Sequence, residues 1–237
     1  MRLRSHFLFI CWVFFGIFFA QESISEENLW TRLKAGNERF ISGKLQEKSL
    51  REERLNLRES QHPYAIILTC ADSRVSPELI FDESLGNLFV IRVAGNVTSA
   101  EVLGSIEYAA EHLHSSFLLV LGHEGCGAVK AALQKGKTTP WIESLLKQIR
   151  PALKKYTEKD LAKAIQSNVD LQIQRLGKSS ILKELIAHHK FQVFGGVYAF
   201  QTGQVELLEP QPSLSEFLSK KTKKKHSPDT PPKKIRI

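Results

Sequence analysis

Two short segments of the sequence carry side chains that bind metal ions and transfer protons. Residues 70–74 read Cys-Ala-Asp-Ser-Arg, and residues 123–126 read His-Glu-Gly-Cys. Two cysteines and one histidine make a three-ligand zinc set that leaves a fourth position open, the pattern of catalytic rather than structural zinc sites. We therefore expect Cys70, His123 and Cys126 to bind Zn²⁺.

Each segment directly follows an apolar run that predicts a buried strand. Residues 64–69 precede Cys70, and residues 117–122 precede His123. Short apolar runs bounded by turn residues are typical of buried strands. Because the carboxyl ends of parallel strands lie on one edge of an open α/β sheet, the thiols and the imidazole are expected to converge there.

Apolar runs alternate with helical patterns along the rest of the chain. Further strands are predicted at residues 88–93, 192–198 and 204–208, with amphipathic helical segments between the strands. This alternation predicts an α/β fold in which a mostly parallel β-sheet is flanked by helices on both faces. The last two strands lie close together in sequence and predict a hairpin with an antiparallel edge strand.

Two segments resemble the signature segments of the β-class carbonic anhydrases, in particular those of the plant type. They are residues 70–75 and residues 122–127. The resemblance extends from about Trp30 to Leu208. It implies a β-carbonic anhydrase-like fold and a zinc-dependent lyase, carbonate dehydratase. Such an enzyme reversibly hydrates carbon dioxide to bicarbonate and a proton by a zinc-bound hydroxide. Family pockets are shared across a dimer interface, so a homodimer or higher homo-oligomer is also implied.

Asp72 and Arg74 lie beside the first proposed ligand. Two thiolates and a neutral imidazole already cancel the charge of Zn²⁺, so a further carboxylate would oppose hydroxide formation unless it were neutralised. Arg74 can do so by a bidentate bond to Asp72. The resemblance implies that Asp72 accepts a hydrogen bond from the hydroxide, and that Arg74 keeps Asp72 off the metal. The alternative is a structural ion pair that caps the loop.

The resemblance also implies a substrate pocket built from Gln61, Phe89 and Tyr108. Gln61 would donate a hydrogen bond to bicarbonate, and the two aromatic rings would form a dry surface for carbon dioxide. The alternative is that Phe89 and Tyr108 are plain core residues. In some members of the family, a tryptophan at the position of Ile67 accompanies an inhibitory bicarbonate site. Because this chain has Ile67 there, we expect the plant-type form, whose active site is always open. Ala199 replaces a common aspartate, and we expect no catalytic effect.

The net charge of +8 is concentrated at the two ends of the chain. Residues 220–237 hold eight Lys or Arg and one Asp, and Arg2 and Arg4 add two positive charges, which leaves −1 for the rest. A nearly neutral body argues against a nucleic-acid partner. The basic tail at 211–237 is expected to be disordered, and a non-catalytic role for it at anionic surfaces stays open.

The first 20 residues have the pattern of a secretory signal peptide. Arg2 and Arg4 precede an apolar run that ends at Ala20 and is short for a bilayer span. We expect export, to a periplasm or outside the cell, with an uncleaved membrane anchor as the alternative. An N-terminal helical arm at residues 21–60 and a catalytic domain at residues 61–210 are expected to follow.

Two other functions remain open on the same residues. Cys70 and Cys126 are the two thiols left after residue 20, and export favours disulfides, so an exported redox protein is one alternative. A related zinc hydrolase of carbon disulfide or carbonyl sulfide is the other. Zinc content and carbon dioxide hydration distinguish these alternatives.

Overall fold

The computed structural model of the protein describes residues 26–134 and 136–209. Its centre is a five-stranded sheet of order β2-β1-β3-β4-β5. Strands β1 to β4 are parallel, and β5 runs antiparallel to β4. The strands are β1 (Ala65–Thr69), β2 (Leu88–Arg92), β3 (Phe117–His123), β4 (Gln192–Tyr198) and β5 (Val205–Leu207). The predicted sheet, including its antiparallel edge strand, is therefore confirmed.

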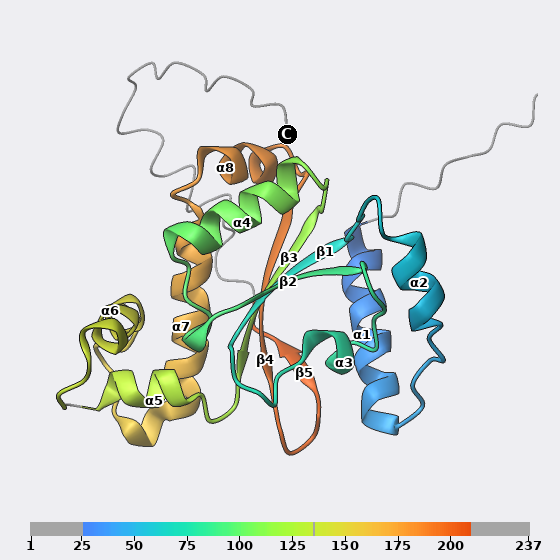
Figure 1. Cartoon of the computed structure of the whole chain (residues 1–237). Coiled ribbons are helices and arrows are strands. Elements are labelled where there is room, and N and C mark those ends of the chain that lie inside the picture. The colour runs from blue at the N-terminus through green and yellow to red at the C-terminus, as the bar shows by residue number, and fades with distance from the viewer. Residues whose placement is uncertain (1–25, 135, 210–237) are drawn as a thin grey trace, which may run out of the picture.

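Helices cover both faces of this sheet (Figure 1). Helices α4, α7 and α8 pack on one face, and α1 and α3 pack on the other. The helices are α1 (Glu26–Ser42), α2 (Leu50–Asn56), α3 (Pro77–Ile80), α4 (Ala100–Glu111), α5 (Gly127–Leu133), α6 (Pro140–Ile149), α7 (Leu161–Leu176) and α8 (Ser180–Ala187). Short 3₁₀ turns lie at Ala94–Asn96, Arg150–Ala152 and Glu158–Asp160.

The central strands are buried on both faces, which explains their continuous apolar sequences. Along β1, Ile66 and Leu68 pack against α4, α7 and α8, while Ile67 packs against α1 and α3. Gly122 in β3 allows α7 to approach closely, because a Cβ there would lie 2.8 Å from a methyl group of Val169. This contact fixes α7 across the strand that ends in His123.

Local sequence signals set the starts of two helices. Ser99 caps α4 by accepting a hydrogen bond from the N–H of Val102, and Pro77 begins α3. The charged helix α2 ends at Asn56. It buries none of its residues, so no packing supports a further turn.

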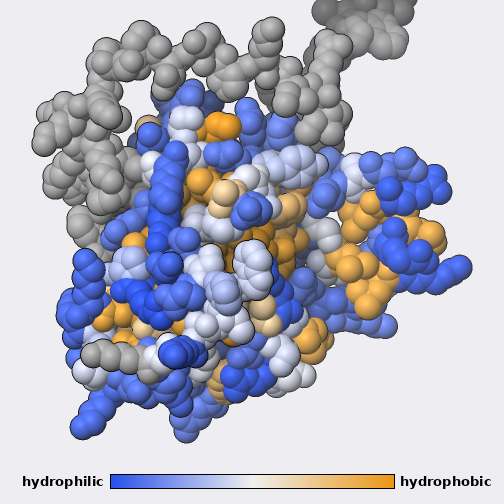
Figure 2. Space-filling model, turned by 60° about the vertical axis from the view of Figure 1, so that its left-hand side comes forward, coloured by the Kyte–Doolittle hydropathy of each residue, from blue (hydrophilic) through white to orange (hydrophobic). Residues whose placement is uncertain are grey.

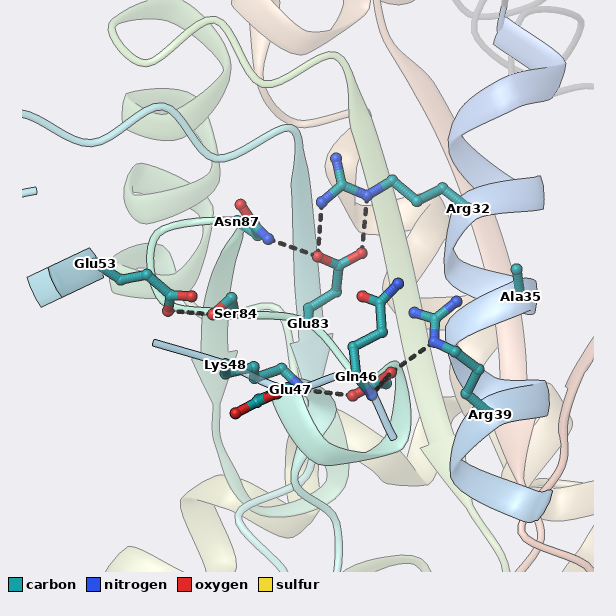
Figure 3. Close-up of a pocket in the computed structure, with 11 residues that line it drawn as sticks. Arg32, Ala35, Arg39, Gln46, Glu47, Lys48, Glu53, Glu83, Ser84 and Asn87 are labelled. Atoms are coloured by element: carbon teal, nitrogen blue, oxygen red, sulfur yellow. Dashed lines mark hydrogen bonds and ion pairs between the residues drawn. The ribbon is translucent and has the colours of Figure 1, made fainter. Parts of the chain in front are cut away.

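A cluster of ion pairs attaches α1 and the segment after it to the end of α3 (Figure 3). Asp82, whose side chain is fully buried, pairs with Arg39 and Lys48, and Glu83 pairs with Arg32. The hollow at this cluster measures about 390 Å³ and is polar. Because its acids and bases already pair with each other, we assign it a structural role. It anchors the helix that directly follows the residue 70–76 loop.

Two of the predicted segments lie outside the described residues. These are the signal peptide at residues 1–20 and the basic tail at residues 211–237. Within the described part of the chain, none of the helices combines the length and the apolar character needed to cross a bilayer.

Candidate functional site

The two predicted ligand segments meet at the carboxyl edge of the sheet. Cys70 directly follows β1, His123 ends β3, and Cys126 caps α5. All three residues are buried, and one ligand atom from each lies within 4.8 Å of the other two. The sheet thus brings together residues that are 53 positions apart in sequence, because β1 and β3 are parallel neighbours.

The imidazole of His123 is oriented for metal binding. Its Nδ1 lies 2.9 Å from the carbonyl oxygen of Glu124, so Nδ1–H donates and Nε2 keeps its lone pair. Nε2 is buried and has no hydrogen-bond partner among the residues that the structure describes. A buried unpartnered nitrogen is costly unless it receives a ligand. A thiophilic divalent cation held by this nitrogen and two sulfurs would remove that cost.

The two cysteine thiols have different pKa values. Hydrogen bonds from the Cys126 thiol and from the backbone N–H of Gly95 hold the pKa of Cys70 well below its usual range, against the effect of burial. The pKa of Cys126 is raised, first by its hydrogen bond to Cys70 and then by burial. One thiolate therefore forms readily, and a bound cation would favour the second. Both sulfurs are free, so the structure has no disulfide between them.

Asp72 and Arg74 form a bidentate ion pair at the mouth of this cluster. The two guanidinium–carboxylate hydrogen bonds measure 2.9 and 2.8 Å, and the backbone N–H of Arg74 donates a third over 3.0 Å. The Arg74 side chain holds the pKa of Asp72 well below its usual range. Oδ2 of Asp72 lies 4.0 Å from Nε2 of His123. The carboxylate is therefore ionised, neutralised and adjacent to the ligand atoms.

Three further residues, which were not predicted from the sequence, support the site. Arg92 ends β2 and donates to the carbonyl oxygens of Asp72 (2.6 Å) and Cys70 (3.4 Å), which fixes the ligand loop. Asn168 and Gln172 lie buried on α7 and bind the turn at Ala94–Asn96 and the residues that follow it. Polar residues four apart on the apolar side of a predicted helix were the available signal for this pair.

The predicted substrate residues lie toward the amino ends of the strands, away from the carboxyl ends where the cysteines lie. Gln61 is exposed before β1, and Phe89 pairs in register with Ile66 near the start of that strand. The Phe89 and Tyr108 rings pack with their centroids 6.4 Å apart. Cys70 is four residues further along the strand than this level, a distance of about 13 Å at ~3.3 Å per residue. The structure brings Phe89 and Tyr108 together, but one chain does not bring them to its own metal cluster.

Comparison with known proteins decides the family. The family model described as carbonic anhydrase matches residues 65–205, which include all three proposed ligands, Asp72 and Arg74. The chain belongs to the β-class carbonic anhydrases. The predicted family, fold class and enzyme class are thereby confirmed.

Individual carbonic anhydrases match over most of their length. "Carbonic anhydrase 2" of Mycobacterium tuberculosis is 37% identical over 201 residues, which cover 79% of this chain and 95% of that protein. The solved β-carbonic anhydrase CcaA superimposes with a TM-score of 0.62 at 27% identity, covering 77% of this chain and 92% of its own. A Coccomyxa β-carbonic anhydrase in complex with acetazolamide gives 0.60 at 28% identity, covering 77% and 82%.

Proposed function

We propose that this carbonic anhydrase is a zinc enzyme that reversibly hydrates carbon dioxide, with Cys70, His123 and Cys126 as the metal ligands. One observation carries the assignment. Three buried ligand atoms lie within 4.8 Å of one another, and the histidine nitrogen among them has no hydrogen-bond partner in the described part of the chain. When bound, zinc supplies a Lewis acid that makes water a nucleophile near neutral pH.

Asp72 and Arg74 complete the chemistry that the metal would support. Two thiolates and a neutral imidazole balance the charge of Zn²⁺, so one more carboxylate must be neutralised if the site is to favour an anionic nucleophile. The bidentate bond from Arg74 does this. The Asp72 carboxylate then accepts a hydrogen bond from the attacking oxygen and directs its lone pair at the carbon of carbon dioxide.

The test is zinc content measured alongside the rate of carbon dioxide hydration by stopped flow. We expect stoichiometric zinc, hydration well above the buffer rate, and loss of both on chelation. Bound zinc with no rate above buffer, together with hydrolysis of carbon disulfide or carbonyl sulfide, would replace our assignment by the related hydrolase. A metal-free protein whose thiols cannot be titrated would instead support the redox alternative, against which the free sulfurs count.

A second copy of the chain is part of this proposal. Gln61, Phe89 and Tyr108 lie away from the cysteines of their own chain, so a substrate pocket beside the metal requires these residues from a partner. Strand β2 is an edge strand with half-buried apolar side chains, which is a surface that proteins commonly cover. Figure 2 shows hydrophobic residues gathered in the centre of one face, as a partner surface would require.

The always-open form of the enzyme follows from the same set of proposals. Ile67 occupies the position of the tryptophan that accompanies an inhibitory bicarbonate site, and its side chain is fully buried between the sheet and α1. It offers no donor to an anion. We therefore expect carbon dioxide hydration without inhibition by bicarbonate at a separate site, which steady-state kinetics at rising bicarbonate would check.

Export remains a proposal from the first 20 residues alone. Arg2, Arg4 and the apolar run that follows them favour a signal peptide. N-terminal sequencing of the protein recovered from its native host checks this proposal. A chain beginning after residue 20 supports cleavage, and a chain beginning at residue 1 contradicts it.

A further inference from the structure

The ring of Phe200 lies among the groups of the proposed active site. This residue follows β4, and its ring centroid is 4.2 Å from Cζ of Arg74. The imidazole of His123 meets the same ring edge-on, with centroids 5.6 Å apart. The ring therefore touches the residue that neutralises Asp72 and one of the proposed metal ligands.

Arg74 needs such a contact because its own environment restrains it weakly. Its side chain is 60% exposed, and exposed ion pairs contribute little to holding two side chains together. A flexible arginine in water loses conformational freedom when it is held in one geometry. In the described part of the chain, its side chain has a hydrogen-bonding partner in Asp72 and an aromatic partner in Phe200. The aromatic contact thus bears directly on how often the pair is formed.

The position of Phe200 is itself fixed by the metal-binding loop. Its backbone N–H donates to Oε2 of Glu124 over 3.0 Å. The N–H of Glu124 donates to the carbonyl oxygen of Tyr198 over 2.8 Å, so the two segments are joined at two points. The Tyr198 ring packs edge-on against that of Phe200, with centroids 5.4 Å apart. The ring is therefore held in place without help from Arg74.

We propose that Phe200 is a positioning residue that holds the Arg74 guanidinium against Asp72. The proposal rests on the proposed function, because it concerns the same site. Oδ2 of Asp72 lies 4.0 Å from the ligand nitrogen of His123, so an Asp72 released by Arg74 is next to the metal ligands with an unneutralised charge. Phe200 raises the fraction of molecules in which the carboxylate stays paired and oriented.

The decisive comparison is Phe200→Leu against Phe200→Tyr. Leucine keeps an apolar side chain but removes the ring face, whereas tyrosine keeps the ring. We expect Phe200→Leu to lower kcat about two- to five-fold with KM little changed, the range that an exposed cation–π contact supports. Phe200→Tyr should restore the wild-type value. Zinc content should stay stoichiometric in both variants.

A second measurement, independent of activity, monitors the Arg74 side chain directly. The Nε–H signal of Arg74 in ¹H–¹⁵N spectra, assigned with Arg74→Lys, should exchange with water two- to five-fold faster in Phe200→Leu than in wild type. The matched control is Phe194→Leu, which removes a ring that stacks on Phe117 in β3, within the sheet. It is expected to lower stability and to leave the Arg74 signal unchanged.

Two results would overturn the proposal. One is an unchanged Arg74 signal and an unchanged kcat in a folded Phe200→Leu protein. The other is a loss in Phe200→Leu that Phe200→Tyr fails to restore, since packing volume rather than the ring face would then be responsible. If the wild-type protein binds zinc but does not hydrate carbon dioxide, the proposed function fails, while the Arg74 exchange rate still tests the contact.

Discussion

The side-chain amide of Asn168 donates a hydrogen bond to the carbonyl oxygen of Gly95 over 2.9 Å. The N–H of Gly95 in turn donates to Sγ of Cys70 over 3.4 Å. Gly95 has φ of +67°, a conformation that glycine adopts without strain. Helix α7 therefore orients a backbone donor toward one of the proposed metal ligands.

Replacing Asn168 by alanine should weaken zinc binding about tenfold, the lower end of the range for groups that orient metal ligands. The turn at Gly95 would lose its anchor, and its N–H would hold the Cys70 sulfur less well. Chelator competition, run where circular dichroism shows the variant folded, measures the affinity. Gln166→Ala, at an exposed position of the same helix, is the matched control. Unchanged affinity in folded Asn168→Ala would contradict the prediction.

Asp72→Asn and Arg74→Ala should each reduce carbon dioxide hydration about 100-fold or more, while zinc stays bound. The first removes the charge that orients the nucleophile, and the second leaves that charge unneutralised beside the ligands. Stopped-flow rates and zinc content of the same samples provide the measurement. Glu78→Gln removes an exposed acid from the neighbouring helix α3 and should leave the rate unchanged. Retained activity in either test variant would reject the roles assigned to this pair.

The stabilising contribution of Asp82 to the folded state should be lost in acid. Burial alone would raise its pKa, but hydrogen bonds from Lys48, Arg39 and the backbone of Gln46 lower it from 3.8 to about 2. A group with a lowered folded pKa stabilises the fold above its unfolded pKa, and that contribution disappears as the pH falls through the folded value. Asp82→Asn should therefore cost about 2–3 kcal/mol at neutral pH and progressively less between pH 4 and pH 2.

Urea unfolding of both proteins across this pH range provides the measurement. The difference in the free energy of unfolding should be constant above about pH 5, where the carboxyl is ionised in both states. A difference that stays constant down to pH 2 would show that the ion pairs with Arg39 and Lys48 are not its source. Glu47→Gln, an exposed acid beside the same cluster, is the control and should change stability little.

Two inactive variants should restore activity when mixed. His123→Ala removes a metal ligand but keeps the proposed pocket, and Tyr108→Ala does the reverse. If the pocket of one chain serves the metal of another, exchange of subunits creates one intact site in each mixed dimer. Hydration should therefore rise on mixing, and size-exclusion chromatography should show dimers or larger species. Mixing without recovery, after proven exchange, would place pocket and metal in one chain.

The sequence allowed the sheet and the ligand cluster to be predicted because both arise from local patterns. The apolar runs before Cys70 and His123 define buried strands, and parallel pairing brings their ends together. Ser99 and Pro77 mark helix starts through local hydrogen bonding and a fixed φ. These signals need no knowledge of tertiary packing.

The supporting residues could not be predicted because their partners are distant in sequence. Asn168 and Gln172 lie on the apolar side of α7, but their partners at Gly95 and Thr98 become evident only when α7 is placed over that turn. Phe200 meets Arg74 only after β4 and the residue 70–76 loop reach the same edge of the sheet. The distance of Phe89 from Cys70 follows from its register with Ile66, which pattern alone does not give.

The placement of Phe89 and Tyr108 at the far end of the strands has a consequence for how the enzyme responds to dilution. If the pocket comes from a neighbour, the turnover per chain depends on protein concentration, although each monomer keeps its fold and its metal. Activity lost below the dissociation constant of the dimer would return on concentrating the sample. The tightness of self-association would then set the lowest abundance at which the cell obtains any benefit from the protein.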